Sequence, residues 1–184
     1  MAYTLALSKA WEDLIKLSKE KIHTVAFVND SYTVDPEKRL MLSLRCNTPA
    51  RQYTAILILH YLIRKSEGIP APTGNWISFK ELAGGQGYYP TSKKRVIEPI
   101  VKKYGSEPEA LLRGGAGGLK VKKAELADVS VVLEAFQEVP VLITFWRGDD
   151  EFGPKANVLF DRSITDIFCT EDIVVLSETI AHTI

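Results

Sequence analysis

The sequence predicts an α+β fold in which a mainly antiparallel sheet packs against a central apolar helix, about residues 49–67, and further helices. Three observations support this prediction. The segment "ARQYTAILILHYLIRKSEG" is apolar on nearly all sides at helical spacing, short β-rich segments occur in hairpin-like groups, and helices separate these groups without regular strand–helix–strand alternation. The length of 184 residues suits one hydrophobic core, so a single domain over residues 1–184 is expected.

Four helices are expected from local signals. Amphipathic spacing begins at Leu5 and continues to about Lys21. The sequence "NTP" at residues 47–49 combines a polar N-cap with a proline in the first turn of the central helix, and Gly68 is expected to end that helix. A third helix, 91–104, contains Pro99 and is expected to kink or divide there, and a fourth begins at "TED", residues 170–172.

Strands are expected where β-branched and aromatic residues lie between turn residues. The sequence "DPEK" predicts a turn between two strands of a hairpin, and a second turn at Glu138–Pro140 joins two adjacent antiparallel strands. The segment "WISFKEL" is expected to form a short strand or a helical turn, and "AGGQGYYP" a glycine loop. The segment "VAFVND", residues 25–30, is β-rich as well, and the other expected strands are 31–34, 39–45, 129–136, 141–146 and 157–161.

The charge of the chain is balanced in total but unevenly distributed. The 23 basic and 23 acidic residues cancel, whereas residues 93–123 hold 9 basic and 3 acidic residues and residues 124–184 hold 3 and 12. Without a net positive charge, nucleic-acid binding is not expected, and no apolar run approaches the roughly 20 residues of a membrane span. Cys46 and Cys169 are too few and too far apart for a disulfide framework or a cysteine cluster, so a cytoplasmic location is expected.

A run of carboxylates in "WRGDDEF", residues 146–152, is the first candidate site. Asp149 and Glu151, joined by Asp161 at the end of the next strand, could supply oxygen ligands to Mg²⁺ or Ca²⁺ or share acid–base chemistry. The spacing does not match an EF-hand. The alternative interpretation is structural, because "GDD" suits a turn and Asp161 is well placed to cap the "RSITDIF" turn that follows.

Two glycine loops, "GGQG" at residues 84–87 and "GGAGG" at residues 114–118, are the second candidate site. Backbone N–H groups in such loops can bind an anion, and a following helix N-terminus adds a favourable dipole. Neither loop matches a P-loop or a dinucleotide-binding motif. The alternative interpretation is that both loops are surface turns.

Aromatic residues near these loops could line a pocket for a flat ligand, and core packing is the alternative. They are Trp76, Phe79, Tyr88, Tyr89, Trp146 and Phe152. His60 lies in the apolar helix and is interpreted as a core histidine with satisfied hydrogen bonds. Cys169 precedes a helix start, where a thiolate would be favoured, but is interpreted as a small apolar residue.

Several segments together resemble a known family. They are "AILILHYLIR", "GNWISFKELAGG" followed by "YYP", and "PVLITFWRGDDEFGPKANVLFD" running into "CTEDIVVL". From about residue 11 to 178 they are similar, in order, to the family catalogued as domain of unknown function 3786. The resemblance implies an origin largely in anaerobic bacteria and archaea, and some members carry a four-cysteine iron–sulfur domain of the type found on corrinoid proteins of one-carbon metabolism. This chain has two cysteines and the family has no established activity, so neither an iron–sulfur centre nor a catalytic residue is carried over.

The expected function is that of a non-enzymatic, cytoplasmic accessory domain that binds a small molecule or a protein partner, and neither nucleic acid nor a membrane. An anaerobic corrinoid or one-carbon context is implied by the resemblance alone. The expected ligand surface joins the first glycine loop to the acidic corner through Gly85, Gly87, Tyr88, Tyr89 and Arg147, whose charge balances the acids. The alternative is a metal-assisted hydrolase or transferase that uses Asp149, Glu151 and Asp161. The sequence does not identify a cofactor or an oligomeric state.

Overall fold

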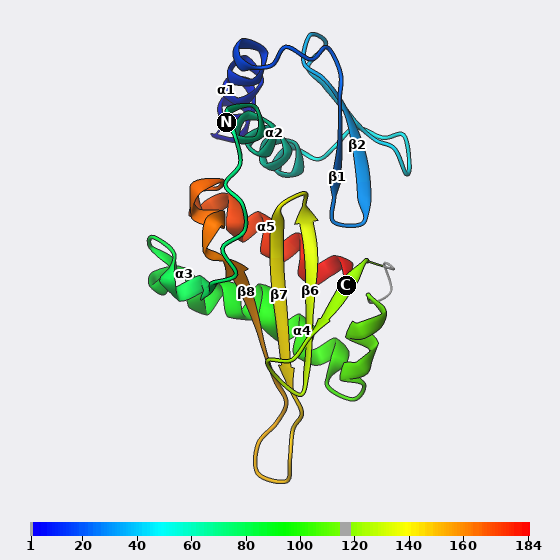
Figure 1. Ribbon diagram of the computed structural model, residues 1–184, viewed down its shortest axis with the longest axis vertical. Helices are drawn as coiled ribbons and strands as arrows, with labels where there is room; N and C mark the ends of the chain where they lie inside the picture. Colours follow the sequence, from blue (N-terminus) through cyan, green and yellow to red (C-terminus); the bar gives the residue numbers. More distant parts are fainter. Residues whose placement is uncertain (1, 115–118) are drawn as a thin grey trace.

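The computed structural model describes residues 2–114 and 119–184 and has the predicted α+β fold (Figure 1). The α-helices are α1 (Ala2–Leu17), α2 (Gln52–Glu67), α3 (Gly85–Ser92), α4 (Glu98–Tyr104) and α5 (Thr170–Thr183). The strands are β1 (His23–Phe27), β2 (Asp30–Asp35), β3 (Leu40–Ser43), β4 (Trp76–Ser78), β5 (Val121–Ala124), β6 (Val129–Phe136), β7 (Val139–Trp146) and β8 (Lys155–Asp161). The shorter helical turns are η1 (Phe79–Glu81), η2 (Lys93–Ile97), η3 (Pro108–Arg113) and η4 (Arg162–Asp166).

The strands form two antiparallel sheets. A three-stranded sheet has the order β1-β2-β3, and a five-stranded sheet has the order β4-β8-β7-β6-β5. In Figure 1 the smaller sheet lies with α1 and α2 at one end of the molecule, and the larger sheet lies with the remaining helices. The connection between β7 and β8, residues 147–154, extends at the opposite end from α1 and α2.

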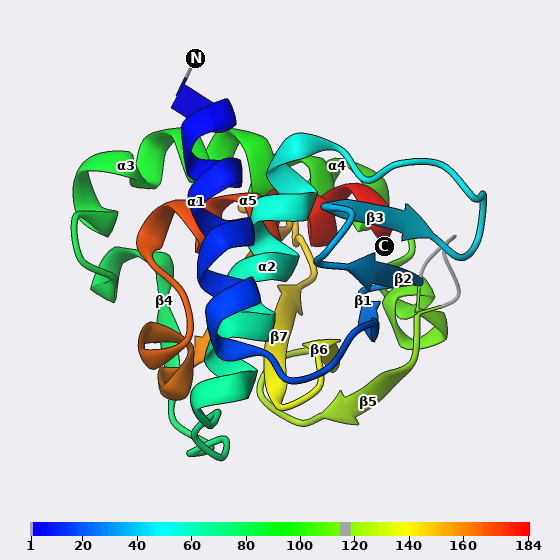
Figure 2. The same cartoon turned by 90° about the horizontal axis from the view of Figure 1, so that it is seen from above.

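The central apolar helix is α2, and its sequence explains its burial. Its apolar residues continue around the helix, and the six consecutive residues from Thr54 to Leu59 are all buried. The helix packs beside α1, as Figure 2 shows from above, and also contacts α5. Gly68 ends the helix as predicted, with a φ of 109° and its N–H donating to the Arg64 carbonyl at 2.9 Å.

Phe136, at the end of β6, joins the two sheets and α2. Its ring stacks on Phe27 of β1 with centroids 4.5 Å apart and on Tyr61 of α2 at 4.4 Å. The Val28 N–H donates to the Ala135 carbonyl at 2.8 Å, which places the β1–β2 turn against the end of β6. The core therefore continues from the smaller sheet into the larger one.

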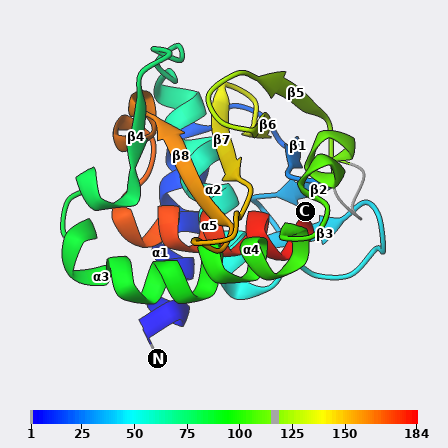
Figure 3. The same cartoon turned by 90° about the horizontal axis from the view of Figure 1, so that it is seen from below.

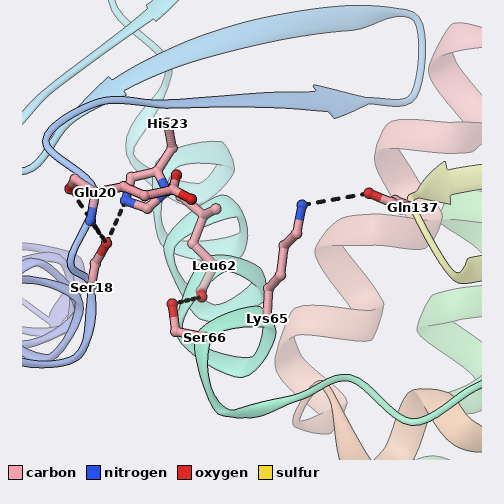
Figure 4. A network of polar contacts seen from close by, with 7 residues as sticks. All are labelled: Ser18, Glu20, His23, Leu62, Lys65, Ser66 and Gln137. Carbon is pink, nitrogen blue, oxygen red and sulfur yellow. Dashed lines mark hydrogen bonds and ion pairs between the residues drawn. The ribbon is translucent and has the colours of Figure 1, made fainter.

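Polar contacts join α2 to the β6–β7 turn, and a separate group of contacts lies in the α1–β1 connection (Figure 4). The Lys65 amino group donates to the Gln137 side chain at 3.5 Å, at the turn between β6 and β7. His23 is buried at the start of β1, where its ring nitrogens lie 2.8 Å from the Ser18 hydroxyl and 3.0 Å from the Glu20 carboxylate. These contacts satisfy a buried histidine close to the α1–β1 connection.

The helical segment from α3 to α4 differs from the prediction at its start. It begins at Gly85, so the expected loop "AGGQGYYP" is largely helical. Gly84 has a left-handed φ of 71°, and a Cβ on Gly85 would lie 1.9 Å from the Phe79 carbonyl oxygen. Glycine is thus required where the chain turns into the helix, and the same glycines that suggested a loop allow the helix to begin.

The π-helical turn η2 separates α3 from α4 shortly before Pro99. The ring of a proline inside a regular helix clashes with the carbonyl four residues earlier, and a widened turn relieves this contact. The predicted break at Pro99 is thus a local change of helical period over Lys93–Ile97. Figure 3 shows the α3–α4 segment beside α5, with β8 next to it.

Candidate functional site

A groove lies between the α3–α4 segment and the hairpin formed by β7 and β8. It has a volume of about 920 Å³ and is lined by residues within 89–102 on one side and within 146–157 on the other. The helical wall is placed by the packing of η2 and α4 on β8. The other wall is the connection between β7 and β8, which lies near α4 in Figure 3.

Three of the predicted site residues lie together in this groove. Tyr89 comes from α3, and Arg147 and Asp149 follow the end of β7. The predicted proximity of the "GGQGYYP" segment to the "WRGDDEF" corner is thus present in the structure. The aromatic residues Trp146 and Phe152, which are 37% and 59% exposed, also line the groove.

The other predicted ligand contacts lie outside the groove. The Tyr88 ring is directed at Phe79, with centroids 6.0 Å apart, and Gly85 is buried against the Phe79 backbone. Gly87 is exposed on α3 and does not line the groove. The predicted open glycine loop is therefore the start of a helix, and the Gly85 N–H donates to the Leu82 carbonyl at 2.9 Å. In the second glycine loop, residues 115–118 lie outside the described residues.

Arg147 has a different partner from the one predicted. Its guanidinium pairs with Glu109 of η3, and its backbone N–H donates to the Asp128 carboxylate at 2.8 Å. Asp149 instead accepts hydrogen bonds from the backbone N–H groups of Phe152 at 2.7 Å and Glu151 at 2.9 Å, which lower its pKa. Arg147 is therefore held by η3, and Asp149 shapes the turn.

Basic residues dominate the charge of the groove. Lys93, Lys102 and Lys155 line it, and Lys80 lies beside it with its amino group 4.2 Å from the centre of the Tyr89 ring. Within the described chain, none of these four amino groups forms an ion pair with a carboxylate. The acidic residues in the lining are Glu98 and Asp149. The surface expected to be acidic is thus predominantly basic and aromatic.

The three carboxylates of the predicted metal site do not come together. Asp149 and Glu151 precede β8, whereas Asp161 ends it, and seven strand residues extend over roughly 20 Å. β7 and β8 are antiparallel, so the C-terminal end of β7, before Asp149, and the C-terminal end of β8, at Asp161, lie at opposite ends of the sheet. Among the described residues, no group of three histidine, cysteine or acidic side chains is arranged to hold a metal ion. The hypothesis of one site containing Asp149, Glu151 and Asp161 therefore has no geometric basis.

Asp161 instead organises the backbone around β4 and η4. It is 1% exposed, and its carboxylate accepts hydrogen bonds from the N–H groups of Thr73 at 3.0 Å, Gly74 at 2.6 Å and Ser163 at 2.9 Å. Burial alone would raise the pKa of Asp161, but these hydrogen bonds outweigh burial and lower the pKa to about 2. The predicted capping of the "RSITDIF" turn is present, through the Ser163 N–H.

A buried carboxylate also satisfies His60. The His60 Nδ1 atom lies 2.8 Å from Asp172, which is 7% exposed in the first turn of α5. The Cys169 thiol donates to the same carboxylate at 3.2 Å, and burial raises the pKa of this thiol to about 11. His60 thus has the expected hydrogen bond, but its side chain is 35% exposed and lies outside the core. Cys169 is a neutral thiol at physiological pH.

The residues that sequence reasoning missed are the lysines of the groove. Lys80, Lys102 and Lys155 come from three separate segments, and only their place in the fold brings them together. The basic block over 93–123 was the available signal, because it contains two of the four lysines.

Among the described residues, no helix has the length and apolar character required to cross a bilayer.

Comparison with known proteins gives a family for the chain. A search of curated proteins and of solved structures found no match. The family described as "Domain of unknown function (DUF3786)" matches residues 11–183. These residues include α2, both sheets and both walls of the groove. Because the match covers nearly the whole chain, the protein belongs to this DUF3786 family.

Proposed function

We propose that the protein is an accessory domain that binds an anionic group of a small molecule or of a partner protein in the groove between α3–α4 and the β7–β8 hairpin. The observation that carries this proposal is the set of four lysines, Lys80, Lys93, Lys102 and Lys155, which surround an aromatic groove without carboxylate partners in the described chain. Convergent basic groups of this kind attract a negative charge.

The aromatic residues add an apolar contact to the charge. Tyr89 and Trp146 provide flat surfaces, and the Lys155 amino group lies 5.3 Å from the centre of the Phe152 ring. Ligand sites combine such apolar area with a few charged groups that fix orientation. Arg147 is already paired with Glu109, so its guanidinium shapes the wall, and the four lysines, which form no ion pair within the described chain, supply the remaining basic charge.

The proposed setting is the cytoplasm of an anaerobic organism. The two widely separated cysteines favour a reducing compartment, and the family resemblance suggests corrinoid or one-carbon chemistry as the metabolic context. In this setting the domain serves a partner enzyme by binding, and the groove is its point of contact.

Tryptophan fluorescence tests the proposal, because, of the three tryptophans, Trp146 lines the groove, whereas Trp11 in α1 and Trp76 in β4 do not. The probes are inorganic pyrophosphate and a heptapeptide of alternating glutamate and valine, titrated at low ionic strength. At least one probe is expected to bind, and added salt is expected to weaken binding because the contacting charges are exposed. Trp146→Phe is expected to remove the fluorescence change.

A matched pair of charge reversals provides the control. Lys93→Glu with Lys102→Glu changes the groove, while Lys122→Glu with Lys123→Glu makes the same change in net charge on β5, at the other edge of the larger sheet. The groove pair is expected to weaken binding about tenfold or more, and the β5 pair by much less. Equal effects of the two pairs, or no binding of either probe, would contradict the proposal.

A further inference from the structure

One edge of the larger sheet is open inside the groove. β4 is the neighbour of β8 on this side, but it pairs only through Trp76, Ile77 and Ser78 with the last three residues of β8. After Ser78 the chain turns away into η1. Residues 155–158 therefore pair with β7 on one side and, within the described chain, with no strand on the other.

The main chain of this edge is also without other partners. In a paired antiparallel strand, alternate residues direct both N–H and C=O away from the neighbouring strand. Across the described residues, the hydrogen bonds outside the strand ladders include none to the main chain of 155–158. An edge of this kind is a template for the addition of another strand.

The open edge runs along the groove and into a second hollow. Lys155, Ala156 and Asn157 line the groove, and Asn157, Val158 and Phe160 line an adjoining hollow of about 240 Å³. Both hollows share Tyr89, Ile97 and Asn157. From residue 155 to residue 158 a strand advances roughly 10 Å, which accommodates about four residues of an extended peptide.

We propose that the β8 edge binds an extended acidic segment of a partner protein as an added β-strand. This proposal rests on the proposed function and specifies its ligand as a polypeptide. Strand addition supplies main-chain hydrogen bonds, while side chains of alternate residues enter adjacent pockets. The four lysines in and beside the groove, which form no ion pair within the described chain, complement acidic side chains, and Ile97 and Val101 of the helical wall offer apolar contacts to the residues between them.

The test uses three peptides that differ only in their backbone. The first is the heptapeptide of alternating glutamate and valine, the second carries N-methyl groups on the glutamate amides, and the third carries them on the valine amides. An added strand directs alternate amides at β8, so one methylated peptide is expected to bind like the parent and the other about tenfold more weakly. Hydrogen exchange at residues 155–158 is expected to slow when the parent peptide binds.

Several outcomes would overturn strand addition. If both methylated peptides bind like the parent, main-chain hydrogen bonds do not hold the peptide. If both lose affinity equally, the peptide does not pair with β8 through alternate amides. Binding of pyrophosphate without the parent peptide restricts the groove to small anions. A stable homodimer by sedimentation, with residues 155–158 already protected from exchange, assigns the edge to a second copy. These four outcomes contradict strand addition but not anion binding in the groove. If neither pyrophosphate nor the parent peptide binds, the proposed function is contradicted as well.

Discussion

At the scale of single residues, Asp161 combines burial with a full set of hydrogen bonds, and its loss should be costly. Asp161→Asn places an N–H₂ group against three backbone donors, and we expect the free energy of unfolding at pH 7 to fall by about 2–3 kcal/mol. Urea denaturation measures this change.

The stability difference between wild type and Asp161→Asn should depend on pH, because the pKa of Asp161 is lowered in the folded state. The folded pKa of about 2 lies below the unfolded value of about 3.9, so the ionised carboxylate contributes its full stability above about pH 4. This contribution is lost as the pH falls through about 2. The gap between wild type and Asp161→Asn should therefore narrow from pH 4 towards pH 2, and a gap that stays constant would contradict the account.

The two cysteines should differ in reactivity. Both thiols are exposed, but hydrogen bonds with Ser43 and Thr48 lower the pKa of Cys46, whereas partial desolvation and the neighbouring Asp172 carboxylate raise the pKa of Cys169 to about 11. Because the thiolate is the nucleophile, iodoacetamide at pH 8 should modify Cys46 about tenfold faster or more. Mass spectrometry of the labelled peptides measures both rates, with Cys46→Ser as the control that removes the fast phase. Equal rates would show that these local contacts do not control the thiols.

At the scale of secondary-structure elements, alanine substitutions of two nearby glycines at the start of α3 are expected to change the stability of the fold in opposite directions. A Cβ on Gly85 would collide with the Phe79 carbonyl, so Gly85→Ala should destabilise the fold by about 1–3 kcal/mol. A Cβ on Gly87 meets no atom within 4 Å, and alanine is the better helix former, so Gly87→Ala should stabilise by up to about 1 kcal/mol. Thermal melts of both variants test this pair, and the same sign for both would refute it.

Local patterns predicted the elements well where burial follows a simple period. Strand β6 matches the expected 129–136, and Gly68 ends α2. The helix containing Pro99 was expected to begin at residue 91, but the helical segment begins at Gly85. Adjacent glycines are typical of loops, so the sequence pattern did not indicate this helix start. Strand β5, with two lysines among its four residues, was missed because a charged edge strand has no apolar alternation.

At the scale of the whole molecule, Phe136 should make unfolding cooperative across both sheets. Phe136→Ala removes a ring that contacts Phe27 and Tyr61 and lies 5.8 Å from Phe168, and we expect a loss of about 3–5 kcal/mol. Phe152→Ala, at an exposed position, is the matched control and should change stability by about 0.5 kcal/mol or less. Circular dichroism and tryptophan fluorescence should report one coincident transition in the wild type and in Phe152→Ala, and two separate transitions in these proteins would show that the sheets unfold independently.

The spatial arrangement of the candidate site was only partly predictable from the sequence. The proximity of Tyr89 to Arg147 and Asp149 was expected, and all three line the groove. Asp161 was assigned to the same site because it ends the strand after Asp149, but antiparallel pairing sends the two strand ends in opposite directions. The basic block over 93–123 indicated part of the charge of the groove, but the convergence of its lysines could not be predicted, because they come from η1, η2, α4 and β8.

The central claim is that the groove between α3–α4 and the β7–β8 hairpin is the binding surface of the molecule, and its most direct test is a map of amide chemical shifts. Spectra recorded during titration with pyrophosphate and with the glutamate–valine heptapeptide locate the bound probe. We predict that the largest shift changes fall within residues 89–102 and 146–157. Changes centred instead on the hollow near Tyr53 and His182, or on the β5 lysines, would contradict the account, as would the absence of any change.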